Sequence, residues 1–178
     1  MDYDNFYKLV ISRQACRDFN DKKVEPEKAA KICKLARFAP SACNSQPSKM
    51  YCITSDSAVK AVAQTLQKDG RNKFVSKASA FIVVSEKEIT LMKDVNAVYG
   101  ADYFVKYDVG ETVAYITLAA KSLGIESCII GWVDGDKLKE ILAFEKNEKC
   151  SIVVALGYSD APLRQKIRKS ENEVIEFV

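Results

Sequence analysis

Three short runs of apolar, largely β-branched residues place the strongest constraint on how this 178-residue chain can fold. They occupy residues 80–84 (AFIVV), 127–132 (SCIIGW) and 151–156 (SIVVAL). The 80–84 run is apolar on both faces, which is typical of a central strand with helices on either side. We therefore predict a buried sheet containing these three strands, with a further short strand at 50–54. No apolar run approaches the roughly 20 residues that would cross a bilayer, so no membrane partner is expected.

Helical patterns alternate with these runs, and the alternation favours an α+β or α/β fold. We expect helices over residues 4–11, from Pro26 to before Pro40, and over 57–68, 108–123 and 134–143. The 108–123 helix carries one complete apolar stripe and most of a second. Such a helix must be covered on both sides, either by its own domain alone or by its own domain and a second subunit. The alternating apolar end, residues 174–178, also needs a docking place, for example as an added strand.

The amino-acid composition excludes several classes of partner and of catalytic site. With 48% hydrophobic and 29% charged residues, the chain fits one globular domain spanning 1–178. The net charge of +3 is spread along the sequence, so nucleic acid is not expected as a partner. Histidine is absent, which excludes histidine-based catalytic dyads, HExxH zinc sites and histidine-ligated haem. Any chemistry therefore needs another proton carrier or a cofactor.

The six cysteines form no CxxC pair, so neither a metal site nor a thioredoxin-type motif is predicted. Most of them lie in apolar stretches and are interpreted as packing residues. The first residues, MDYDNFYKLV, do not follow a signal-peptide pattern. We expect a reducing, cytoplasmic location.

Four segments suit ligand binding, and each also has an ordinary explanation. Residues 12–19 carry Arg13 and Arg17, which could simply be solvated. Residues 39–47 are small or amide-bearing between prolines, able to bind a polar heterocycle or to form a plain loop. Residues 124–132 end a strand at Gly131, where a ligand could approach the backbone or a bulge could form. Residues 164–169 hold four cations, suited to a phosphate or to a solvated tail.

In this order and spacing, the four segments resemble the nitroreductase family of FMN-dependent oxidoreductases. The family pattern RRSxRxF corresponds to residues 13–19, PSxxNxQPW to 40–47, LGxxxxWIG to 123–131, LGYP to 156–159 and the basic RKP-like tail to 168–170. The resemblance covers nearly the whole chain. It implies an α+β fold with a mixed sheet flanked by helices, in an intertwined homodimer with one FMN per subunit at each interface. An arm of about 162–178 would extend onto the partner subunit.

The resemblance also implies roles for individual residues. The FMN phosphate would be bound by Arg13, Lys166 and Arg168, with Gln14 as a neutral donor. Arg17, assisted by Lys73, would stabilise the reduced flavin, and Asn72 would lie nearby. Backbone N–H groups of Ile130 and Gly131 would face flavin N5. The partner subunit would supply Pro40, Ser41, Ala42 and Asn44.

Several positions depart from the family pattern. Ala15 stands where many members have a phosphate-binding serine, and Ser48 replaces the usual tryptophan. Losing one hydroxyl bond to the phosphate would cost about 1–2 kcal/mol, roughly tenfold in affinity. Residues 99–107, rich in tyrosine and phenylalanine, would form either a lid over the flavin or part of the core.

The implied activity is a ping-pong exchange in which NADH or NADPH reduces FMN and an electron-poor small molecule, such as a nitroaromatic or a quinone, reoxidises it. No protein side chain is assigned a catalytic role, because the flavin performs the chemistry. Three alternatives stay open: a flavin-binding or storage protein, a flavin-destroying or dehalogenating enzyme of the same superfamily, and a non-enzymatic scaffold that binds acidic partners. A GxGxxG or P-loop motif is absent, which argues against those nucleotide-binding folds.

Overall fold

A four-stranded sheet forms the centre of the computed structural model, which describes residues 2–87, 89, 92–100 and 102–178. The strands are β1 (Ser48–Ile53), β2 (Ala80–Lys87), β3 (Glu126–Ile130) and β4 (Glu148–Gly157), in the order β1-β2-β4-β3. All three pairings are antiparallel. The resemblance implied a mixed sheet, with both parallel and antiparallel pairs. In the described part of the chain, the one parallel pairing is an isolated bridge between Ala15 and Ser127.

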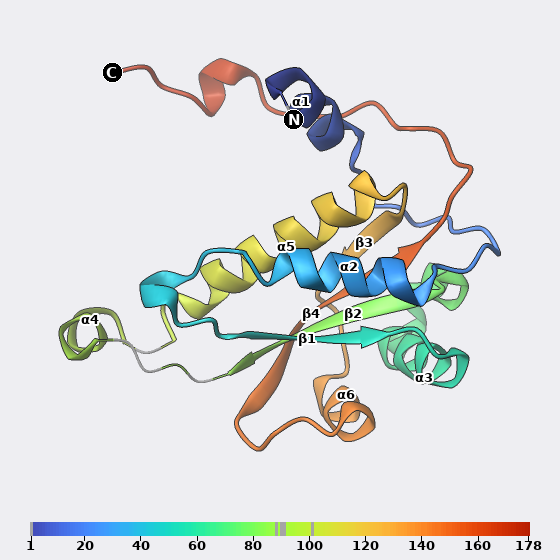
Figure 1. Cartoon of the computed structure of the whole chain (residues 1–178), viewed down its shortest axis with the longest axis horizontal. Coiled ribbons are helices and arrows are strands. Elements are labelled where there is room, and N and C mark those ends of the chain that lie inside the picture. Colours follow the sequence, from blue (N-terminus) through green and yellow to red (C-terminus); the bar gives the residue numbers. More distant parts are fainter. Residues whose placement is uncertain (1, 88, 90–91, 101) are drawn as a thin grey trace.

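Helices cover both faces of this sheet (Figure 1). They are α1 (Tyr3–Ser12), α2 (Pro26–Ala36), α3 (Asp56–Leu66), α4 (Lys93–Tyr99), α5 (Val105–Ser122) and α6 (Gly135–Leu142). α2 and α5 lie on one face, and α3 and α6 on the other. The five predicted helices are confirmed, whereas α4 was not predicted. No helix among the described residues is both long enough and apolar enough to span a membrane.

Strand β2 explains why its run is apolar throughout. Ala80, Ile82 and Val84 pack in the core beneath α2 and α5. Phe81 and Val83 alternate with them and pack in the core formed with α3 and α6. All five are fully buried. The predicted central position of this strand is confirmed, since β2 lies between β1 and β4.

Strand β3 differs from its prediction as a buried strand. It lies at the edge of the described sheet, and Ile129 is 44% exposed although Cys128 and Ile130 are buried. The apolar run does not reveal this, because an edge strand beside another covering segment has the same composition as a central one. Here that segment is residues 15–16, where the Cys16 N–H donates to the Ser127 carbonyl at 2.9 Å.

Some apolar surfaces remain uncovered within the single chain. On α5, Val109, Val113 and Ile116 are buried, but Ala114 and Tyr115 are exposed. The ten-residue helix α1 buries none of its side chains. The chain end contains a short 3₁₀ turn, η4 (Glu171–Glu173), and forms no strand over 174–178. The predicted added strand concerned a partner subunit and stays a prediction.

Candidate functional site

The predicted phosphate residues at the two ends of the sequence meet in space. The backbone N–H and Nε of Arg164 donate to Gln14 Oε1 at 3.2 and 3.3 Å, and its Nη2 donates to the Ala15 carbonyl at 2.5 Å. Lys166 Nζ donates to the Arg13 carbonyl. Figure 1 shows the same juxtaposition, with the red C-terminal segment running alongside α1 and the chain that follows it. The early and the C-terminal cations are therefore close in space, although about 150 residues lie between them in the sequence.

The first segment owes its position to the edge of the sheet. Ala15 bridges to Ser127 of β3, and the Asn20 N–H donates to the Tyr158 carbonyl at 2.8 Å. Between these two contacts, Phe19 is 1% exposed and packs directly on Gly157. A Cβ built at Gly157 would lie 2.6 Å from Phe19 Cδ1, so glycine is required for this close approach.

Four cations line one cavity of about 380 Å³ together with Gln14 and Ala15. We call Arg13, Arg164, Lys166 and Arg168 the cationic cluster. Within the described ranges, no carboxylate forms an ion pair with any of them. Burial lowers the pKa of Lys166, and the positive charges of Arg13, Arg168 and Lys121 lower it further. A bound anion would relieve this repulsion, so the residues present fit the phosphate of FMN.

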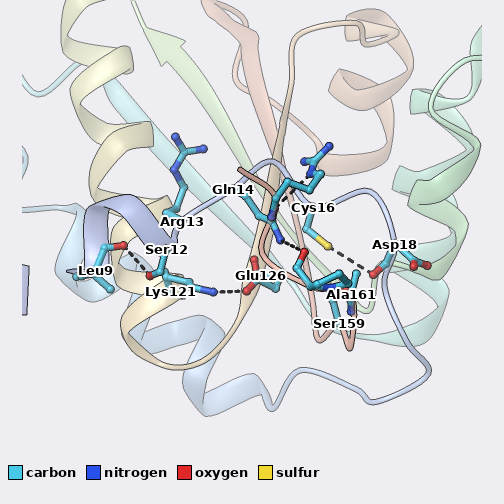
Figure 2. A network of polar contacts seen from close by, with 12 residues as sticks. Leu9, Ser12, Arg13, Gln14, Cys16, Asp18, Lys121, Glu126, Ser159 and Ala161 are labelled. Carbon is cyan, nitrogen blue, oxygen red and sulfur yellow. Dashed lines mark hydrogen bonds and ion pairs between the residues drawn. The ribbon is translucent and has the colours of Figure 1, made fainter. Parts of the chain in front are cut away.

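Gln14, predicted as a neutral donor to the phosphate, makes hydrogen bonds within the chain. Its Nε2 donates to the Pro162 carbonyl at 3.4 Å, and its Oε1 accepts from Arg164. Figure 2 shows this side chain reaching toward the returning tail, while the Arg13 guanidinium points away from the network of dashed contacts. In this structure Gln14 holds the tail in place and leaves the cations to face the cavity.

A second cavity, of about 340 Å³, shares Gln14 and Arg164 with the first and is also lined by Arg17. Arg17 lies beside the thiol of Cys128 on β3: burial raises the pKa of Cys128, and the neighbouring Arg17 acts in the opposite direction. Arg17 is exposed next to β3, and its role in stabilising the reduced flavin stays a prediction.

Two of the remaining predicted residues, Ile130 and Gly131, lie at the end of β3. Ile130 is buried, and Gly131 after it is exposed. The Arg71 guanidinium lies 4.2 Å from the centre of the Trp132 ring, so the chain just before Asn72 reaches this strand end through one side chain. The predicted approach of Asn72 and Lys73 to the flavin stays a prediction. Lys73 is exposed, whereas Asn72 Nδ2 donates to the Leu66 carbonyl at 3.1 Å and so has a local structural role.

The predicted residues Pro40, Ser41, Ala42 and Asn44 form a separate loop, which contains the 3₁₀ turn η1 (Ala42–Asn44). Three non-glycine residues in this loop have left-handed backbone conformations: Cys43 (φ 53°), Asn44 (φ 52°) and Gln46 (φ 48°). Each costs on the order of 1 kcal/mol and persists only where neighbouring contacts enforce it. We refer to residues 41–46 as the η1 loop.

The η1 loop and the cationic cluster lie at opposite ends of α5 (Figure 1). The loop bonds to Asp108 in the first turn of this helix, whereas Lys121, in its last turn, is close enough to influence Lys166. Thirteen residues of helix span roughly 20 Å. One chain therefore does not bring its own η1 loop to its own cationic cluster.

Two residues of this arrangement were missed from sequence. Arg164 belongs to the basic run that was singled out, but only its contacts show that it links the tail to Gln14 and Ala15. Asp108 had no sequence signal beyond its place near a helix start. The Tyr99–Tyr103–Tyr107 series is exposed on one side of α4 and α5, so these tyrosines are not core in the single chain.

A larger cavity of about 570 Å³ lies elsewhere, between α3 and residues 76–79. It is lined by none of the predicted site residues. Its lining is mostly polar but contains both signs of charge, including the Lys23–Asp56 ion pair, whereas the charges around Lys166 are all positive.

Comparison with known proteins gives a consistent result. Residues 10–158 match the family described as the nitroreductase family. A protein of Archaeoglobus fulgidus, provisionally named an NADH dehydrogenase/NAD(P)H nitroreductase, is 30% identical over 155 residues, covering 85% of this chain and 83% of its own length. An oxygen-insensitive NADPH nitroreductase of Helicobacter acinonychis is 25% identical over 203 residues, covering 96% of this chain and 95% of its own.

A solved structure shares the fold. A protein from Exiguobacterium sibiricum, provisionally called a nitroreductase and crystallised in complex with FMN, superposes with a TM-score of 0.80 at 20% identity, covering 97% of each chain. The family match extends over most of the chain and includes the part of the candidate site formed by residues 13–17. The chain belongs to the nitroreductase family.

Proposed function

We propose that this protein is an FMN-dependent oxidoreductase that binds the FMN phosphate at the cationic cluster. One observation carries the proposal: Arg13, Arg164, Lys166 and Arg168 line a single cavity and have no carboxylate partner among the described residues. Such a cluster is unfavourable without an anion, and an arginine fork and a lysine both suit a phosphate dianion. The family match and the FMN complex of a protein with this fold support the same cofactor.

Bound FMN would take hydride from NADH or NADPH and pass it to an electron-poor acceptor, such as a nitroaromatic or a quinone, in a ping-pong sequence. The protein's own residues would bind and orient it. Arg17 would offer positive charge to the ring, and the backbone N–H groups at Ile130 and Gly131 would offer donors at its edge. No side chain is required to act as a nucleophile. The names of the relatives support NAD(P)H as the reductant.

We also propose that the working unit is a homodimer. A ten-residue helix is marginal in water unless it packs, yet α1 buries no side chain in the single chain. Ala114 and Tyr115 of α5 are likewise uncovered. In a dimer, the η1 loop of one subunit could reach the flavin site of the other, whereas within one chain it lies at the far end of α5, roughly 20 Å along the helix from the cationic cluster. The single domain 1–178 would then extend its arm, residues 162–178, onto the partner.

The free thiols suit a reducing compartment such as the cytoplasm.

The experiment that tests this function is an anaerobic reductive titration of the purified protein, followed by addition of an acceptor. We expect NADH or NADPH to bleach the bound flavin rapidly, and a quinone or nitroaromatic to restore its absorbance. Double-reciprocal plots at several acceptor concentrations should be parallel. A protein that binds FMN but is not reduced by either nucleotide would instead be a flavin-binding or storage protein.

A further inference from the structure

We infer that Asp108 is a positioning residue that fixes the η1 loop in the conformation used at the partner subunit's flavin site. The inference rests on the proposed function. It extends that function to a residue that lies in a different region from the cationic cluster and would act only through the loop.

The first step is the burial of the Asp108 carboxylate. Its residue is 4% exposed, although an acid in the first turn of a helix can stabilise the helix dipole equally well from the surface. Burying a carboxylate is unfavourable unless its oxygens accept hydrogen bonds. Both oxygens of Asp108 turn to the η1 loop: Oδ1 accepts from the Ala42 N–H at 3.0 Å, and Oδ2 has a longer contact of 3.4 Å with Ser45 Oγ.

The second step is the strain of the loop. Left-handed backbone at Cys43, Asn44 and Gln46 is unfavourable by itself and needs contacts that enforce it. Ser41 supplies some of them from inside the loop, because its Oγ accepts from the Gln46 N–H at 3.0 Å. From outside the loop, Asp108 is the one side chain of the described residues whose hydrogen bonds reach 41–46.

The third step is what the loop presents. Cys43, Asn44 and Gln46 are exposed, and the Asn44 side chain makes no hydrogen bond within the described chain. The strained conformation therefore displays an amide and several backbone groups outward while its inner side is tied to Asp108. A carboxylate that only complemented the helix dipole would leave the loop conformation independent of its presence.

The test compares Asp108→Ala, Asp108→Asn and the gentler Ser45→Ala with a matched control, Glu111→Ala. Glu111 is an exposed acid one turn further along α5. Hydrogen–deuterium exchange measures the loop in the FMN-free protein, and fluorescence quenching measures the dissociation constant of added FMN. For Asp108→Ala, we expect exchange of the 41–46 amides and the FMN dissociation constant each to rise about tenfold or more. Exchange in β2 and β4 should not change.

The order of the variants separates positioning from general stability. An asparagine Oδ1 can still accept from the Ala42 N–H, so Asp108→Asn should restore part of both properties. Ser45→Ala should change both in the same direction but less, and it keeps the test valid if Asp108→Ala fails to fold. Glu111→Ala should match the wild type.

Unchanged loop exchange in Asp108→Ala and Ser45→Ala would overturn the inference. So would faster exchange with unchanged FMN affinity, because the loop would then be irrelevant to the flavin. Wild-type protein that binds no FMN would refute the proposed function itself, and the role of Asp108 at a flavin site with it.

Discussion

Lys166 shows how a single side chain can indicate a ligand. Most surface lysines have water or a carboxylate as a partner. This one donates to the Arg13 carbonyl, is partly buried, and has its pKa lowered by burial and by neighbouring cations. The unfavourable electrostatics would be reversed by an anion in the adjoining cavity, which is the physical basis for assigning the phosphate there.

We therefore predict that Lys166→Ala combined with Arg168→Ala raises the FMN dissociation constant by about 100-fold or more, since each charge-assisted contact contributes about 1.5–3 kcal/mol. The matched control is Lys169→Ala, which removes an exposed cation of the same tail that does not line the cavity. Fluorescence titration at two salt concentrations measures the effect. Equal affinities in the double variant and the control would show that the phosphate binds elsewhere.

Glu25 supports a prediction about pH. The Tyr158 hydroxyl donates to Glu25 Oε2 at 2.6 Å, and this bond, together with the backbone and Lys28, lowers the pKa of Glu25 from 4.5 to about 2. The ionised carboxylate therefore stabilises the fold above pH 4.5, and this contribution is lost as the pH falls toward 2. Tyr158→Phe should make the free energy of unfolding fall less steeply across this window in urea titrations. Parallel curves for wild type and variant would contradict the assignment. The Glu25 side chain is 44% exposed, so the effect should be small.

At the scale of elements, the position of the first binding segment depends on its contact with β4. Phe19 can pack on this strand only because residue 157 has no side chain. We predict that Gly157→Ala lowers the free energy of unfolding by about 1–3 kcal/mol through overpacking and weakens FMN binding by displacing residues 13–17. Urea unfolding and FMN titration measure the two effects.

Gly110→Ala is the control for that change. Gly110 lies within α5, and a Cβ there would meet nothing within 4 Å. Alanine has the higher helix propensity, so this variant should gain about 0.5–1 kcal/mol. A loss at Gly110 as large as that at Gly157 would indicate that the close approach of Phe19 is not the cause.

The elements that sequence predicted well are those whose residue pattern directly reflects burial. β2 is apolar on both faces because two helical layers cover it, and α5 has a stripe that packs on the sheet. β3 was predicted as a buried strand but lies at the edge of the sheet. Its apolar composition is the same whether its outer side is covered by another strand or by the short segment at Ala15. α4 was not predicted, since it buries none of its residues and lacks a consistent apolar stripe.

The candidate site was predictable only in part, because its residues are brought together by contacts between distant parts of the sequence. The basic run and the early arginines were visible, but spacing does not show that Arg164 bonds to Gln14 and Ala15 while Arg168 donates to the Ile167 carbonyl. Asp108 lies 66 residues from Ala42, and only the folded chain brings them together. Long-range polar contacts of this kind leave no local periodicity to detect.

At the scale of the whole molecule, the single chain exposes apolar side chains that the proposed dimer would cover. α1 presents Phe6 (45% exposed) and Val10 (40% exposed), one helical turn apart, in addition to two tyrosines. We predict that Phe6→Glu with Val10→Glu converts the proposed dimer to a monomer in sedimentation velocity and lowers FMN content, because the η1 loop would no longer reach a partner. Lys8→Glu, an exposed position on the same helix, is the control. A double variant that remains dimeric would exclude α1 from the interface.

The central claim is that the cationic cluster holds a flavin phosphate, and the most direct measurement is the visible spectrum of the freshly purified protein with mass identification of what heat releases. The account predicts yellow protein with absorbance near that of bound flavin, about one FMN per chain, and loss of that colour in the Lys166→Ala, Arg168→Ala double variant. A colourless wild-type protein that also takes up no added FMN would contradict it.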